Sequence, residues 1–145
     1  MMKCHYCLVY LSYATLAAAF VLLCVVIFWG AYPYDPVSTH GQIVVLNEGK
    51  SITSGDSIVT LWDIKKNTNI RPEVERQIVC ESGFVQQLTS QQINLDEGNN
   101  VYRLMVALPD VIPPDVCQVH WTAVYQMNPI RQVTEKFTSE KFEVL

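Results

Sequence analysis

Histidine and the motifs of catalysis are scarce in this chain. It has three histidines, no His-x-x-x-His pair and no glycine-rich segment that would cradle a phosphate. A catalytic triad built on His40 or His120 would need unrelated loops to meet by chance. The acidic side chains are mostly isolated, so no pair is suited to acid and base catalysis. These absences predict a protein that is not an enzyme and has no cofactor.

Basic residues and glycosylation signals are scarce as well. The 145-residue chain has 10 Lys and Arg against 14 Asp and Glu, and Lys65-Lys66 is its one adjacent basic pair. A nucleic-acid partner would require a basic face that neutralises phosphates, so nucleic acid is not an expected partner. The chain has no Asn-x-Ser/Thr sequon, which argues against a glycosylated surface receptor.

One long segment lacks charge altogether. Leu8–Ala31 contains no Asp, Glu, Lys, Arg or His, and its 24 residues are enough to cross a hydrocarbon core of about 30 Å as a helix. A cleaved signal peptide would have a shorter apolar core with small residues before the cut. The segment therefore predicts an uncleaved signal anchor over residues 8–31. Lys3 places residues 1–7 in the cytoplasm and the later domain in the periplasm or outside the cell.

The lipid bilayer is thus an expected partner, and both ends of the run support this. Aromatic side chains with polar tips suit the headgroup level of a membrane. We expect such interface positions at Tyr6, Tyr10, Trp29, Tyr32 and Tyr34. Ala14 and Ala18 lie on one helix face and would let two anchors approach, which leaves a homo-oligomer open.

The rest of the chain is organised in strands. Residues 32–41 contain two prolines and predict a stalk, and residues 42–145 predict one all-β domain. In Ser57–Ile64 and Val101–Leu108 every second residue is suited to a core, which is typical of strands. Further runs are expected at 42–47, 76–88, 116–127 and 130–144, with glycine or proline turns between them. About seven strands with short turns favour an antiparallel β-sandwich.

Val116–Met127 is the expected central strand. One of its faces carries Cys117, Val119, Trp121, Ala123 and Tyr125, which predicts a buried face. The wider core is expected to include Trp62, Leu104, Val106, Val119, Trp121 and Tyr125.

The end of the chain carries a resemblance. Pro113-Pro114-Asp115, the pattern C-x-V-x-W-x-x-x-Y from Cys117, the turn at Asn128–Arg131 and the closing Phe142–Val144 resemble the last two strands of an immunoglobulin-like β-sandwich. Behind an N-terminal anchor, such a domain is similar to small single-pass membrane proteins of phages and prophages. The resemblance covers residues from about 40 onward. A cysteine stands where antibody-type domains have their corner tyrosine. The resemblance therefore does not imply antigen-type recognition.

The five cysteines lie on different sides of the expected anchor: Cys4 and Cys7 precede it, Cys24 lies within it, and two follow it. Cys80 and Cys117 are the two that follow the anchor, and an oxidising compartment would let them form a disulfide. Two buried thiols acting as small hydrophobic residues are the alternative. Cys4 and Cys7 have the spacing of half a zinc site, but the chain offers no further ligands there, so no metal is expected.

The expected contact surface is a polar segment between two strands. Loops on a rigid scaffold often carry recognition. The residues proposed for contact are Lys65, Lys66, Asn67, Asn69 and Arg71.

Two functions follow from these features. The first is a non-catalytic, membrane-anchored extracytoplasmic interaction module. It would act in the bacterial envelope on an envelope protein or cell-wall partner, and the resemblance implies a phage role in envelope modification, exclusion or lysis. The alternative is a structural or assembly subunit of a secretion or conjugation apparatus, for which a long exposed edge strand would be a signal.

Overall fold

The chain forms one N-terminal helix and a separate β-rich domain. The computed structural model describes residues 2–31, 35–90, 93 and 95–145, without the side chains of residues 2–8, 31 and 48. Helix α1 spans Met2–Ala31 and so begins before the expected anchor. Its segment Val9–Gly30 has 22 residues, none of them buried, which corresponds to about 33 Å at the rise of a helix. That length and composition suit a membrane span, and a signal sequence would have them too.

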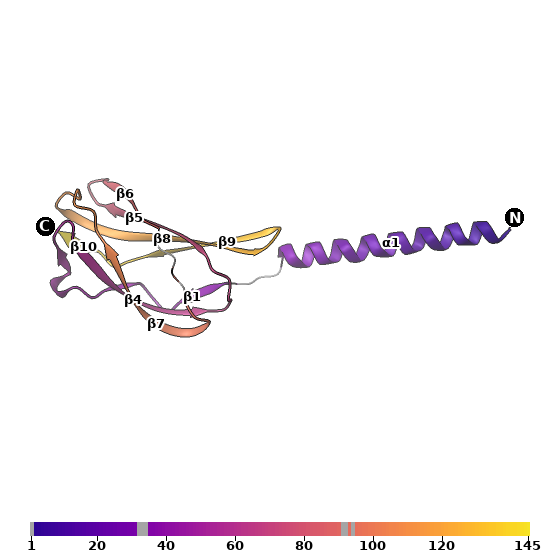
Figure 1. Cartoon of the computed structure of the whole chain (residues 1–145), viewed down its shortest axis with the longest axis horizontal. Coiled ribbons are helices and arrows are strands. Elements are labelled where there is room, and N and C mark those ends of the chain that lie inside the picture. The colour runs from indigo at the N-terminus through magenta and orange to yellow at the C-terminus, as the bar shows by residue number, and fades with distance from the viewer. Residues whose placement is uncertain (1, 32–34, 91–92, 94) are drawn as a thin grey trace. The chain divides into compact units, whose positions relative to one another are not determined.

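The first sheet is built around β4 (Ser57–Lys66). Strand β7 (Gly98–Ala107) pairs antiparallel with all ten residues of β4. Strands β1 (Val37–Thr39) and β2 (Val44–Val45) therefore lie along its opposite edge, where both pair antiparallel. Figure 1 shows β4 and β7 running together along the domain.

The second sheet is built around β8 (Asp115–Asn128), the longest strand. Strand β5 (Glu73–Cys80) pairs along one edge and carries β6 (Val85–Leu88) outside it. Strands β9 (Arg131–Thr138) and β10 (Phe142–Val144) follow the other edge, and β3 (Ser51–Ile52) pairs parallel with β10. A short 3-10 turn, η1 (Glu48–Lys50), precedes β3.

The two sheets bury a common core. Buried residues alternate with less buried ones throughout β4 and from Cys117 to Tyr125 in β8, as the hydrophobic pattern predicts. The indole rings of Trp62 and Trp121 meet edge to face with their centroids 4.8 Å apart, so they join the sheets directly. Of the expected core residues, Leu104 is half-buried and the others are buried.

Three expected segments differ from the structure. The run 76–88 is a hairpin, because Gly83 at a φ of 90° turns the chain between β5 and β6. The run 130–144 is two strands, because the buried Ser139 turns its hydroxyl to the β8 backbone and accepts a hydrogen bond from Val119 N at 3.0 Å. The expected stalk ends early, because Val37–Thr39 pairs with β4 and Val37 is buried.

Candidate functional site

The candidate site is a pocket between the two sheets, here called the end pocket. Its enclosed space is small, about 20 Å³, which is enough for about one water molecule. Its walls come from both sheets and from the segment before β7. All the lining side chains except one are apolar or aromatic: Val37, Trp62, Ile64, Lys66, Pro72, Val74, Ile93, Leu95, Trp121, Ala123, Tyr125 and Phe137.

Lys66 is the charged residue of the end pocket. It is the last residue of β4 and only 3% exposed. Its Nζ donates a hydrogen bond to the carbonyl of Leu95 at 2.7 Å, and it forms no ion pair within the described part of the chain. An ammonium group has three donors, so a neutral carbonyl leaves most of its bonding capacity unused.

Two tryptophans from opposite sheets line the same pocket. Trp62 Nε1 donates to Thr60 Oγ1 at 3.0 Å, and that hydroxyl in turn donates to Leu104 O. Trp121 is 1% exposed, and its Nε1 has no hydrogen-bond partner among the described residues. Buried polar atoms almost always have a partner, so this indole nitrogen is an exception.

An acidic residue lies close to one wall. The pKa of Tyr125 is raised to about 12, first by burial and then by the charge of Glu135. The pKa of Glu135 is itself raised, first by burial and then by the charge of Asp35. Both shifts have desolvation as their main cause, which marks this part of the domain as poorly hydrated.

The structure places part of the proposed contact segment in a strand. Lys65 and Lys66 belong to β4 and not to a loop, and Lys66 is buried. Asn67 is tied to the start of the domain, because its backbone N donates to Pro36 O at 2.9 Å and its side chain to Asp35 O at 3.0 Å. Asn69 and Arg71 are exposed. The burial of Lys66 was not predicted. Its signal is the alternation of Ile58, Thr60, Trp62 and Ile64, which makes residue 66 the next inward position.

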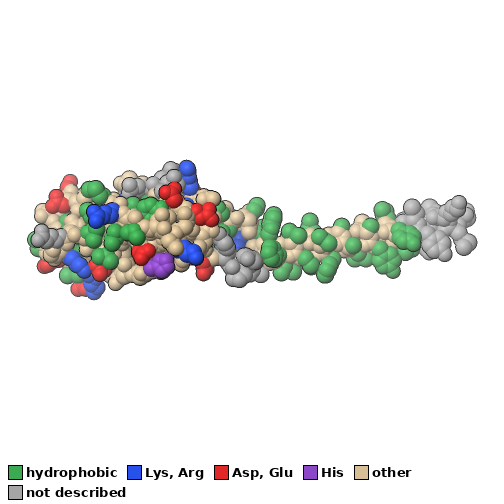
Figure 2. All heavy atoms as spheres, turned by 90° about the horizontal axis from the view of Figure 1, so that it is seen from below, with side chains coloured by type: hydrophobic (Ala, Val, Ile, Leu, Met, Phe, Trp, Pro, Cys, Tyr) green, Lys and Arg blue, Asp and Glu red, His purple; other side chains and the backbone are tan. Residues whose placement is uncertain are grey.

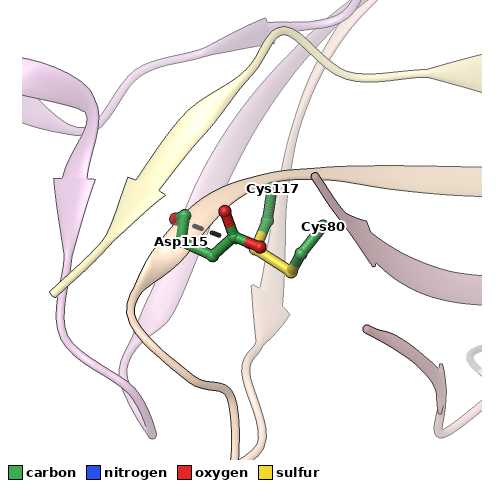
Figure 3. Close-up of side chains that lie close together, drawn as sticks. All are labelled: Cys80, Asp115 and Cys117. Carbon is green, nitrogen blue, oxygen red and sulfur yellow. Dashed lines mark hydrogen bonds between the residues drawn. A yellow bond between two sulfur atoms is a disulfide. The ribbon is translucent and has the colours of Figure 1, made fainter. Parts of the chain in front are cut away.

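Cys80 and Cys117 form the disulfide that the sequence favoured. The two residues lie opposite one another on β5 and β8, with a Cα separation of 4.0 Å (Figure 3). Asp115 lies beside them, and its carboxylate accepts backbone hydrogen bonds from Ser82 and Val116. The hydrogen bonds from Ser82 are the main cause of its lowered pKa. Because the two sulfur atoms are bonded to each other, this cluster offers one carboxylate and is not a metal site.

The expected membrane-interface residues are only partly described. Tyr10 and Trp29 are exposed on α1 at 74% and 47%. Tyr32, Tyr34 and the side chain of Tyr6 lie outside the described residues. Figure 2 shows hydrophobic side chains along the described helix, whereas acidic and basic side chains are mixed over the domain.

A comparison with protein-family models and a comparison with curated proteins gave no match for this chain.

Proposed function

We propose that the protein is a membrane-anchored interaction module whose β domain works outside the cytoplasm. The carrying observation is the combination of a helix whose segment Val9–Gly30 has no charged residue with a disulfide-bonded domain behind it. An exposed apolar surface of this size is unfavourable in water and favourable in a bilayer. Disulfides persist in oxidising compartments, so the bond favours an exported domain.

The strand order supports an immunoglobulin-like domain. The early strands pair with β4 and β4 pairs with β7, while β5, β8 and β10 share the other sheet with β3 parallel to β10. This division resembles the two-sheet arrangement of immunoglobulin-like sandwiches. The disulfide lies within one sheet, whereas in antibody domains it links the two. A bacterial-envelope role for a phage or prophage rests on the resemblance of the sequence, and the partner would be an envelope or cell-wall component.

Paired reporter fusions test the topology. We expect a phosphatase that is active only outside the cytoplasm to be active when fused after Leu145, and a fluorescent reporter that matures only inside to be dark. Lys3→Glu tests the cause of the orientation, because it reverses the lysine charge before the apolar segment Val9–Gly30 and should weaken the orientation. Activity of the inside reporter alone contradicts the proposal.

One observation favours the alternative of an assembly subunit. Strand β7 has ten residues and pairs only with β4 among the described strands. Val101 and Met105 on its outward face are 64% and 65% exposed. A long free edge can add a strand from another chain. Met105→Lys, on that outward face, should reduce oligomers measured by sedimentation if the alternative holds.

A further inference from the structure

We propose that β7 is an interface between two copies of this chain, whose β7 strands pair antiparallel and join their sheets. Tyr102 lies opposite Tyr102 of the second copy at the centre of this interface, and Arg103 reaches Asp63 of the second copy. The inference rests on the interaction role proposed above and gives that role a partner. It does not depend on the side of the membrane.

The backbone of β7 has a free edge. Strand β7 is the outer strand of its sheet and pairs with β4 alone among the described strands (Figure 1). Leu108 N donates to Asp56 O at 2.8 Å, in the register that pairs Ala107 with Ser57. Residues of an antiparallel pair alternate between bonded and non-bonded positions, so the even-numbered residues of β7 bond β4. The odd-numbered residues from 99 to 107 therefore direct their N–H and C=O groups away from β4.

Hydrogen bonds on the other edge of β4 agree with this direction. Asp63 O accepts from His40 N at 3.0 Å, and Val59 O accepts from Leu46 N at 2.8 Å. Both acceptors are odd-numbered residues of β4, which leaves its even-numbered residues to bond β7. Among the described residues, no hydrogen bond reaches the backbone groups that β7 directs outward. Such an edge is a template for a further strand.

The free edge of β7 has little protection against pairing. Edge strands are commonly guarded by charged residues, proline or bulges. Strand β7 has no proline, and Arg103 is its one charged residue. Val101 and Met105 beside it are 64% and 65% exposed. Strand β9, which pairs with β8 alone, carries three charged residues in eight. Of these two edges, β7 is the better suited to add a strand.

Two opposite charges lie on the outward face near this edge. Arg103 on β7 is exposed and forms no ion pair within the described part of the chain. Asp63 on β4 is exposed as well, and His40 Nδ1 lies 3.4 Å from its carboxylate. A partner strand should therefore bring a carboxylate toward Arg103 and a cation toward Asp63. A second antiparallel copy of the same edge brings both.

One register lets the two copies exchange these charges. Asp63 lies directly opposite Val101. When Val101 lies opposite Arg103 of the second copy, Arg103 and Asp63 are two strand spacings apart, about 10 Å between their backbones. The long arginine side chain spans that distance over Val101. A two-fold axis repeats the contact, so the same ion pair forms on both sides of the axis.

Charge disfavours the neighbouring registers. A shift in one direction places Arg103 opposite Arg103 of the second copy, and like charges directly opposite are destabilising. A shift in the other direction places it opposite Asn99, which itself lies opposite Lys65, so two cations again come close. A further shift places it opposite Met105, which lies opposite Val59 and offers no carboxylate.

Tyr102 marks the centre of the favoured register. It lies on the other face of β7 and is half-buried, and its hydroxyl accepts a hydrogen bond from Asp96 N at 2.8 Å. In this register it faces its own copy at a non-hydrogen-bonded position, where opposite side chains are closest. Aromatic pairs at such positions are favourable.

A charge exchange between copies tests the interface. The full chain is measured by sedimentation equilibrium in density-matched detergent micelles. We expect a dimer whose dissociation constant rises at least tenfold in Arg103→Glu and in Asp63→Arg, because each variant places like charges across the interface. An equimolar mixture of the two variants should recover the dimer. Neither variant regains an opposite charge within its own chain, so recovery requires contact between copies. Lys136→Glu, an exposed charge reversal on β9, is the control and should leave the dissociation constant unchanged.

Cysteine crosslinking tests the register. The native disulfide is kept, and Cys4, Cys7 and Cys24 are replaced by serine. Under copper phenanthroline and oxygen, Tyr102→Cys should give a disulfide-linked dimer, because this residue faces itself across the two-fold axis. Leu104→Cys lies on the same face of β7, but its two copies are offset by four residues, about 13 Å. It should crosslink at least tenfold more slowly.

Four results would overturn the proposal. The first two are the absence of a dimer in the natural chain and an unchanged dimer in Arg103→Glu, which would assign self-association to the anchor. The others are a mixture that does not recover the dimer and faster crosslinking through Leu104→Cys than through Tyr102→Cys. Circular dichroism and retention of the native disulfide show that each variant is folded. The reporter fusions are separate, because a β7 dimer in a chain with the opposite topology would refute the proposed function alone.

Discussion

At the scale of single residues, Lys66 is an exception, because it is a charged residue at a buried position where apolar residues are usual. It continues the inward face of β4, and its Nζ reaches the carbonyl of Leu95. We expect Lys66→Met to leave the free energy of unfolding unchanged or to raise it by about 1 kcal/mol, because it removes a buried charge whose partner among the described residues is a neutral carbonyl. Urea denaturation measures this, with Lys65→Met as the control. A loss of more than about 2 kcal/mol would contradict this view of Lys66.

Trp121 joins the sheets and should carry much of the core's stability. It is 1% exposed and contacts Trp62 from the opposite sheet. We expect Trp121→Ala to lower the free energy of unfolding by about 3–5 kcal/mol, because it loses apolar burial and leaves a cavity. Trp121→Phe should cost less. If denaturant melts of Trp121→Ala show a loss below about 1 kcal/mol, the residue is not at the centre of the core.

Gly55 lies in a turn whose backbone conformation favours glycine. Its φ is 87°, and a Cβ there would collide with the carboxylate of Asp110. Gly83 has a similar φ of 90°, but a Cβ there meets nothing within 4 Å. Both alanine variants carry backbone strain at a positive φ, and the exposed Asp110 side chain can turn away from a Cβ at Gly55. We therefore expect each variant to lose about 1 kcal/mol in thermal melts, with similar losses at the two positions. A much larger loss in Gly55→Ala would show that Asp110 is held in place.

At the scale of elements, the alternating pattern predicted β4, β7 and β8 well, because each has one face in the core. It failed where a strand is interrupted by a local feature. Gly83 turns one expected strand into a hairpin. Ser139 separates β9 from β10, and its hydroxyl accepts a hydrogen bond from the backbone of β8. The end pocket could not be predicted, because it depends on how two sheets from distant segments pack around Lys66. The cysteine pair was predictable, since it follows the anchor and has no competing partner.

An ion pair between Lys50 and Glu140 links the early part of the domain to its C-terminal part. Glu140 Oε2 accepts hydrogen bonds from Lys50 Nζ at 2.7 Å and from Val45 N at 3.3 Å. The hydrogen bond from Lys50 is the main cause of the lowered pKa of Glu140. A lowered folded pKa gives stability that is present at neutral pH and is lost as pH falls through that pKa.

Glu140→Gln should therefore be less stable than the natural sequence at pH 7 by a few tenths of a kcal/mol, a small value because the pair is partly exposed. The difference should close as the pH falls below the ordinary glutamate range. Chemical melts from pH 7 to pH 3 measure it. A difference that stays constant over this range would show that the charge of Glu140 is not responsible.

At the scale of the whole molecule, the anchor and the disulfide make the same demand. A helix without charged side chains from Val9 to Gly30 has the length and composition of a membrane span, and disulfides such as Cys80–Cys117 persist in oxidising compartments. In the chain-entropy account, closing a loop across 37 residues stabilises the domain by about 3–4 kcal/mol. Export would thus supply both the location and part of the stability.

The most direct test is the intact mass of the protein from membranes, with thiols trapped by acid before lysis and alkylated after denaturation. We predict a chain that retains residues 1–31, carries three alkyl groups on Cys4, Cys7 and Cys24, and gains two more only after reduction. Five alkyl groups before reduction would place the domain in a reducing compartment. A mass lacking the first 31 residues would mean a cleaved signal sequence, and either result would contradict a membrane-anchored, exported module.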